Sequence, residues 1–157
     1  MEQNFFDHVR DAAESLLGGE HGTFRGTSHR RGVKVWIDAD TGSTSSDGKA
    51  PKEHYEAQLI RVGGDVGLEI GFHAEHRDPT HNALVLDTLH QRESAWRPEL
   101  GDEAEAGAFL GNDDWVRLSE VWPAPDPDDP EAPMEIAARL ADYVDAIESA
   151  RRQTGER

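Results

Sequence analysis

Three histidines and two acidic residues occur within residues 73–81 of this 157-residue chain. Imidazole and carboxylate groups are ligands for divalent transition metals such as zinc, manganese, nickel and iron. If the strand before this segment continues into it, alternation places His73 and Glu75 on one face of the sheet. A single metal ion could then bind His73 and Glu75, with His81 supplied by the turn that follows. This candidate metal site is the strongest chemical signal in the sequence.

The same residues also fit an interpretation without a metal. Their spacing differs from the H-E-x-x-H signature of zinc enzymes. Asp78 stands directly before Pro79, a pair typical of the start of a helix, so its carboxylate already has a role as a cap. The sequence therefore favours a polar strand end with exposed histidines and no bound cofactor. A metal-dependent enzyme that uses residues 73–81 is the alternative.

Other kinds of catalytic site find little support in the sequence. The chain contains no cysteine, which excludes a thiol nucleophile, a disulfide framework and an iron–sulfur cluster. It contains no G-x-S-x-G motif. Its paired glycines stand in turns before strands, not at the strand-to-helix junctions where nucleotide phosphates bind. We therefore name no catalytic residue, and the sequence favours a protein that is not an enzyme.

Charge is distributed unevenly along the chain. The net charge of −16 argues against simple electrostatic binding to DNA, RNA or anionic lipid. Residues 99–135 contain 12 acidic residues and one arginine, a local charge of −11, whereas residues 21–37 carry +4 and no acid. Such polarity favours orientation-selective association. We expect an adaptor-like or chaperone-like module that binds a basic protein partner and forms homo-oligomers.

A candidate interaction surface combines both charged segments with one aromatic residue. Trp36 falls on one face of its strand, and Val33, Val35 and Ile37 fall on the other. It is therefore exposed if helices cover those apolar residues, and exposed tryptophans are typical of interfaces. The residues of this candidate surface are Arg30, Arg31, Trp36, Asp126, Asp128 and Asp129.

Hydrophobic periodicity predicts the elements that must position these residues. Three- and four-residue spacing predicts helices at 4–17, 78–97 and 132–152. Two-residue alternation predicts strands at 21–27, 32–38, 54–62, 66–73, 107–110 and 115–122. The order is α-β-β-β-β-α-β-β-α, and the short turns between successive strands imply a mostly antiparallel sheet. Together these elements predict an α+β fold with two layers, in which three helices cover the sheet.

Residues 1–157 are predicted to form a single domain. Residues 41–52 lack apolar side chains to bury and predict a mobile loop. Residues 123–131, rich in proline and aspartate, predict a connector to the C-terminal helix. No apolar run is long enough to cross a membrane, and the N-terminus lacks the residue order of a signal peptide. These features predict a cytoplasmic protein that does not bind membranes.

The C-terminal half of the chain carries a pattern of spaced leucines, one Leu-Gly pair and one tryptophan. The pattern runs through Leu86-Asp87-Thr88-Leu89, Arg92, Leu100-Gly101 and Trp115, before the acidic connector and the final helix. Over about residues 66–150 it resembles a small bacterial α+β domain of unknown function that is often found beside restriction-endonuclease-like nuclease domains. The resemblance implies a similar order of elements and an accessory or regulatory role in a bacterial defence or restriction system. It identifies no catalytic residue.

Overall fold

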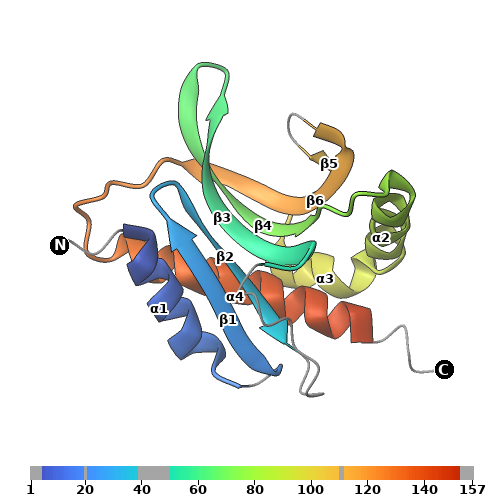
Figure 1. Ribbon diagram of the computed structural model, residues 1–157, viewed down its shortest axis with the longest axis horizontal. Coiled ribbons are helices and arrows are strands. Elements are labelled where there is room, and N and C mark those ends of the chain that lie inside the picture. Colours follow the sequence, from blue (N-terminus) through green and yellow to red (C-terminus); the bar gives the residue numbers. More distant parts are fainter. Residues whose placement is uncertain (1–4, 20, 39–49, 110–111, 153–157) are drawn as a thin grey trace.

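The structure is a computed structural model that describes residues 5–19, 21–38, 50–109 and 112–152 (Figure 1). Within these residues, six strands form one antiparallel sheet in the order β1-β2-β3-β4-β6-β5. The strands are β1 (Thr23–His29), β2 (Gly32–Asp38), β3 (Glu53–Val62), β4 (Asp65–Ala74), β5 (Glu105–Phe109) and β6 (Asn112–Pro123). The helices are α1 (Phe5–Leu17), α2 (Pro79–Gln91), α3 (Glu93–Leu100) and α4 (Ala132–Arg152). The predicted α+β fold is confirmed.

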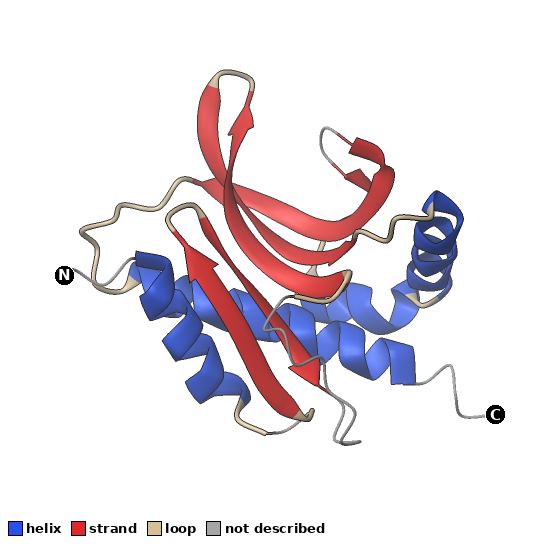
Figure 2. Ribbon diagram, in the orientation of Figure 1, coloured by secondary structure: helices blue, strands red, loops and turns tan. Residues whose placement is uncertain are grey.

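Helices α1 and α4 pack against one face of the sheet, as Figure 2 shows. The predicted register of β4 is confirmed for Leu68, Ile70 and Phe72, which are at most 1% exposed and lie in the core. Val66 continues the same two-residue alternation of the predicted strand, but it is 40% exposed. The reason is its position near the tip of the β3–β4 hairpin, which extends past the helices (Figure 1).

A two-residue turn sets the register of β3 against β4. Gly63 and Gly64 both have positive φ angles, 58° and 93°, which glycine adopts without steric cost. Val62 therefore pairs with Asp65, and paired residues have numbers that add to 127 (62 + 65). The predicted hairpin turn is confirmed, and its register decides which side chains of the two strands meet.

The helix predicted at 78–97 is two helices, separated at Arg92. The expected end before Pro98 is wrong, because Pro98 lies inside α3. Trp96 is fully buried in this helix, and its indole N–H donates to the carbonyl oxygen of Leu89 at 2.7 Å. Tertiary packing thus outweighs the local cost of the proline. In the described part of the chain the sheet is accompanied by four helices, where three were expected.

The remaining segments follow the predicted order. Helix α4 has the predicted bounds, and residues 124–131 form no helix or strand, as expected of a connector. Most of the predicted loop at 41–52 lies outside the described residues. Among the described residues, no helix is both long enough and apolar enough to span a membrane.

Candidate metal centre

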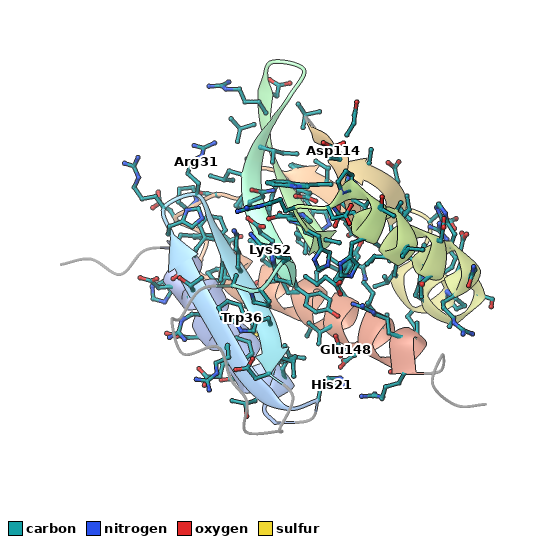
Figure 3. The ribbon with its side chains drawn as sticks, turned by 45° about the vertical axis from the view of Figure 1, so that its right-hand side comes forward. His21, Arg31, Trp36, Lys52, Asp114 and Glu148 are labelled. Atoms are coloured by element: carbon teal, nitrogen blue, oxygen red, sulfur yellow. The ribbon has the colours of Figure 1, made fainter. Side chains whose placement is uncertain are left out.

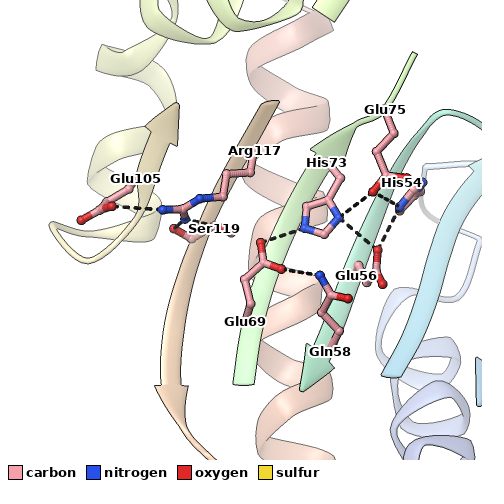
Figure 4. Close-up of polar contacts among 9 residues, drawn as sticks. All are labelled: His54, Glu56, Gln58, Glu69, His73, Glu75, Glu105, Arg117 and Ser119. Atoms are coloured by element: carbon pink, nitrogen blue, oxygen red, sulfur yellow. Dashed lines mark hydrogen bonds and ion pairs between the residues drawn. The ribbon is translucent and has the colours of Figure 1, made fainter. Parts of the chain in front are cut away.

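A buried group of polar side chains lies on the face of the sheet opposite α1 and α4 (Figure 4). Strand alternation explains the separation, because the neighbours of the apolar core residues on β3 and β4 must point the other way. The register of the hairpin places His54 directly opposite His73. The backbone N–H of Glu75 donates to the carbonyl oxygen of Lys52 at 2.8 Å, which brings Glu75 to the same end of the hairpin.

Four ligand atoms of this group lie within 4.8 Å of one another: His54 Nε2, Glu56 Oε1, His73 Nδ1 and Glu75 Oε2. The Glu56 oxygen lies 3.1 Å from the His54 nitrogen and 3.0 Å from the His73 nitrogen. The Glu75 oxygen lies 3.6 Å and 3.2 Å from the same two nitrogens. A tetrahedral metal site with bonds of about 2.0–2.1 Å separates its ligands by about 3.3–3.4 Å. The four nitrogen–oxygen distances, 3.0–3.6 Å, bracket that value, so the group is compact enough to surround one ion.

Each imidazole uses its outer nitrogen for a separate acceptor. His73 Nε2 donates to Glu69 Oε2 at 2.7 Å, and His54 Nδ1 donates to the carbonyl oxygen of Pro51 at 2.8 Å. Glu69 is itself held by Gln58, whose amide nitrogen donates to Glu69 Oε1 at 2.9 Å. These bonds fix both rings with their inner nitrogens toward the carboxylates. Metal-binding histidines have the same outer hydrogen bonds.

The cluster is nearly closed to solvent and strongly charged. The side chains of His54, Glu56 and His73 are 1%, 5% and 0% exposed, and that of Glu75 is 14% exposed. Burial by itself raises the pKa of Glu56, but hydrogen bonds with His54 and His73 outweigh it and lower that pKa to about 2. Burial lowers the pKa of His73, yet hydrogen bonds with Glu56, Glu69 and Glu75 hold it well above its ordinary value. The surrounding carboxylates thus favour a positive charge at the His73 imidazole.

Strand β6 adds a cation beside the cluster. Arg117 pairs with His73 across β4 and β6, and it is 8% exposed. Its guanidinium donates to Ser119 Oγ at 2.7 Å and lies 3.2 Å from Glu105 Oε1. Its Nε has no hydrogen-bond partner among the described residues. Arg117 therefore bounds the acidic cluster on the β6 side.

The predicted metal ligands are divided between two groups. The structure brings His73 and Glu75 together, but His81 lies elsewhere, near His76 and Glu53. The cause is α2, which begins at Pro79 and places His81 in its first turn. The expectation of an exposed strand end is also wrong for His73, which is fully buried.

The sequence interpretation missed three residues of the cluster, namely His54, Glu56 and Glu69. A signal for them was present. The Gly63-Gly64 turn pairs residues whose numbers add to 127, and this sum places His54 opposite His73. Glu56 lies two residues after His54 and therefore on the same face of β3. Glu69 lies four residues before His73 and therefore on the same face of β4.

The candidate interaction surface is only partly exposed. Trp36 is 7% exposed, so the expectation of an exposed tryptophan is wrong. Figure 3 marks its position on β2. Trp36 lies on the same face of the sheet as the buried cluster, and that face is closed to solvent there as well. The other members of the surface are exposed: Arg30, Arg31, Asp126, Asp128 and Asp129.

Comparison with known proteins returns no match: no family model fits the chain, and no curated protein or solved structure is significantly similar to it. The resemblance to a domain found beside bacterial nucleases stays a prediction.

Proposed function

We propose that this domain binds one divalent transition-metal ion between β3 and β4, with His54, Glu56, His73 and Glu75 as its ligands. The observation that carries the proposal is the orientation of the two imidazoles. Each donates its outer N–H to an acceptor outside the group, a carboxylate for His73 and a carbonyl for His54. Each then directs its inner nitrogen at the same two carboxylates.

The cluster requires positive charge between its imidazoles and its carboxylates, supplied either by protons or by a metal ion. A neutral imidazole with its outer nitrogen protonated would point a lone pair at a carboxylate oxygen, which is repulsive. Two protons, one on each inner nitrogen, relieve that repulsion. A divalent cation relieves it for all four ligand atoms at once. With two neutral imidazoles and two carboxylates, a divalent ion also forms a neutral centre, which suits a buried site.

The donor set and the burial define the kind of metal and its role. Two imidazole nitrogens and two carboxylate oxygens suit zinc, iron or manganese. Structural metal sites have all positions filled by protein ligands, whereas catalytic sites keep one open. Three of these four side chains are at most 5% exposed. We therefore assign the ion a structural or regulatory role, in a domain that need not be an enzyme.

The test measures metal that survives removal of free ions. The purified chain is stripped with a chelator, loaded separately with zinc, manganese and iron(II), and desalted before elemental analysis. We expect one retained ion per chain and a higher melting temperature, because a ligand specific to the native state stabilises it by mass action. His73→Ala and Glu56→Gln should both lose the retained ion.

His90→Ala is the matched control, since His90 is an exposed histidine of α2 outside the cluster. It should retain the ion and the thermal shift. Retention of stoichiometric metal by His73→Ala, or no retained ion with any of the three metals, would contradict the proposal. Circular dichroism of the metal-free variants separates loss of a ligand from loss of folding.

A further inference from the structure

A small pocket lies where four separate segments of the chain meet, far along β3 and β4 from the metal cluster. It has a volume of about 200 Å³. Its lining is mostly apolar and comes from the start of α1, the β3–β4 hairpin, the β1–β2 turn and the connector before α4. The residues that line it include Phe6, Arg30, Val66, Pro125 and Pro127.

Charges of opposite sign border this pocket on two sides. Arg30 lines it from the β1–β2 turn, with exposed Arg31 next in the chain. Pro125 and Pro127 line it from the connector, whose aspartates, including Asp126 and Asp128, are exposed. Figure 1 shows the connector passing close to the turn between β1 and β2. The segments that carry opposite charge in the sequence are therefore neighbours in space.

These charges are not neutralised within the part of the chain that the structure describes. The ion pairs found there include none formed by Arg30 or Arg31, and none formed by the aspartates of the connector. Two connector carboxylates, Asp126 and Asp129, instead accept backbone N–H groups of the connector itself. Val66, at the wall of the pocket, is 40% exposed although it is apolar. The surface thus has an open apolar centre with a basic side and an acidic side.

A surface of this kind is complementary to itself. In a two-fold symmetric contact the same patch meets its own copy after a rotation of 180°. If the axis passes through the apolar centre, the basic side of one copy faces the acidic side of the other, twice. The two apolar centres then cover each other. A unipolar acidic patch would instead repel its copy.

We propose that two copies of this chain form a two-fold symmetric dimer through this surface, in which Arg30 and Arg31 of each copy face the connector of the other. The dimer depends on opposite charges at the rim, so it weakens as salt rises. The inference is independent of the metal centre, whose residues take no part in the contact.

Sedimentation velocity of the full chain over a range of concentrations tests the dimer at about 50 mM and about 500 mM salt. Arg30→Glu/Arg31→Glu and Asp126→Lys/Asp128→Lys should each weaken self-association at least about tenfold at low salt, because each places like charges opposite each other twice. An equimolar mixture of the two variants should form a heterodimer, because both halves of its contact again pair opposite charges. Circular dichroism establishes that each variant is folded before mixing.

Asp102→Lys/Glu103→Lys is the matched control, since these exposed acids lie between α3 and β5 and give the same change of charge as the aspartate variant. It should dimerise like the unmodified chain. A chain that stays monomeric at every concentration overturns the proposal. So does a dimer that ignores both charge reversals, or two variants that fail to associate when mixed. Binding of an oligolysine peptide by a monomeric chain would assign the acidic side to a basic partner instead.

Discussion

Glu120 lies on the helix-facing side of β6 and joins the sheet to α4. Its carboxylate accepts hydrogen bonds from Arg139 Nε at 3.0 Å, Arg139 Nη2 at 2.8 Å, the Tyr143 hydroxyl at 2.7 Å and the Trp122 indole at 2.7 Å. Burial raises the pKa of Glu120, but the bonds from Arg139, Tyr143 and Trp122 outweigh it and lower that pKa. The residue is 6% exposed. One carboxylate thus accepts four hydrogen bonds from three side chains, those of Arg139, Tyr143 and Trp122.

Glu120→Ala should therefore destabilise the fold by about 2–4 kcal/mol at neutral pH. This is somewhat less than the full cost of breaking a buried ion pair, because Arg139 is partly exposed. Chemical denaturation of both chains measures the difference. Glu103→Ala, an exposed acid, should change stability by less than about 0.5 kcal/mol. Equal stability of Glu120→Ala and the unmodified chain would show that this hydrogen-bond network does not stabilise the fold.

Lowering the pH should reduce the difference in stability between the unmodified chain and Glu120→Ala. A lowered folded-state pKa means that Glu120 contributes stability above its unfolded value near 4.5, and that this contribution is lost as pH falls through the folded-state pKa. The stability gap between the unmodified chain and Glu120→Ala should therefore shrink between pH 5 and the acid limit of folding, about pH 2–3. Denaturation curves at successive pH values test this. A stability gap that grows as the pH falls would contradict a lowered pKa of Glu120 in the folded state.

At the scale of elements, β4 and β6 lie too close together at Gly71 to admit a side chain. A Cβ on Gly71 would lie 2.3 Å from the carbonyl oxygen of Leu118 and 2.5 Å from Ser119 Cα. Both are backbone atoms of β6, so no side-chain rotation can make room. Gly71 lies two residues before His73 on the same face, so the close approach also sets the position of the metal cluster against β6.

Gly71→Ala should separate β4 from β6 and cost about 1–3 kcal/mol or more, the range typical of overpacking. It should also lower the amount of metal retained, because His73 moves with β4. Gly107→Ala is the matched control, since a Cβ there meets nothing within 4 Å. Denaturation and elemental analysis of the two variants give the comparison. Unchanged stability of Gly71→Ala would show that the strands can part without cost.

The sequence predicts elements well where local periodicity and packing agree. Residues 66–72 alternate cleanly, and the sheet buries Leu68, Ile70 and Phe72 of their apolar face; α4 has its predicted bounds for the same reason. Pro98 fails as a helix stop because buried Trp96 holds the segment in a helix. His81 fails as a ligand for a similar reason. Its position depends on where α2 packs, and spacing along the chain carries no information about that.

At the scale of the whole molecule, the basic and acidic segments are less separated in space than they are along the chain. The basic residues of the β1–β2 turn lie beside the acidic connector, around one pocket. The acidic connector therefore reduces the positive potential of the turn, and salt screens what remains beyond the Debye length, about 8 Å at physiological salt. With a net charge of −16, the rest of the surface repels polyanions. Both effects oppose contact with phosphate backbones.

We therefore predict no measurable binding to random duplex DNA at physiological salt. Binding to phosphates requires clustered lysines and arginines that release counterions, and the clearest basic segment here is matched by a nearby acidic one. Fluorescence anisotropy with a labelled duplex of random sequence measures this, with the chain at concentrations where it is monomeric and where it is dimeric. Arg30→Glu/Arg31→Glu should leave the titration unchanged. Micromolar binding that this variant abolishes would make the β1–β2 turn a phosphate-binding site, and would mean that the local arginine pair outweighs the field of the whole molecule.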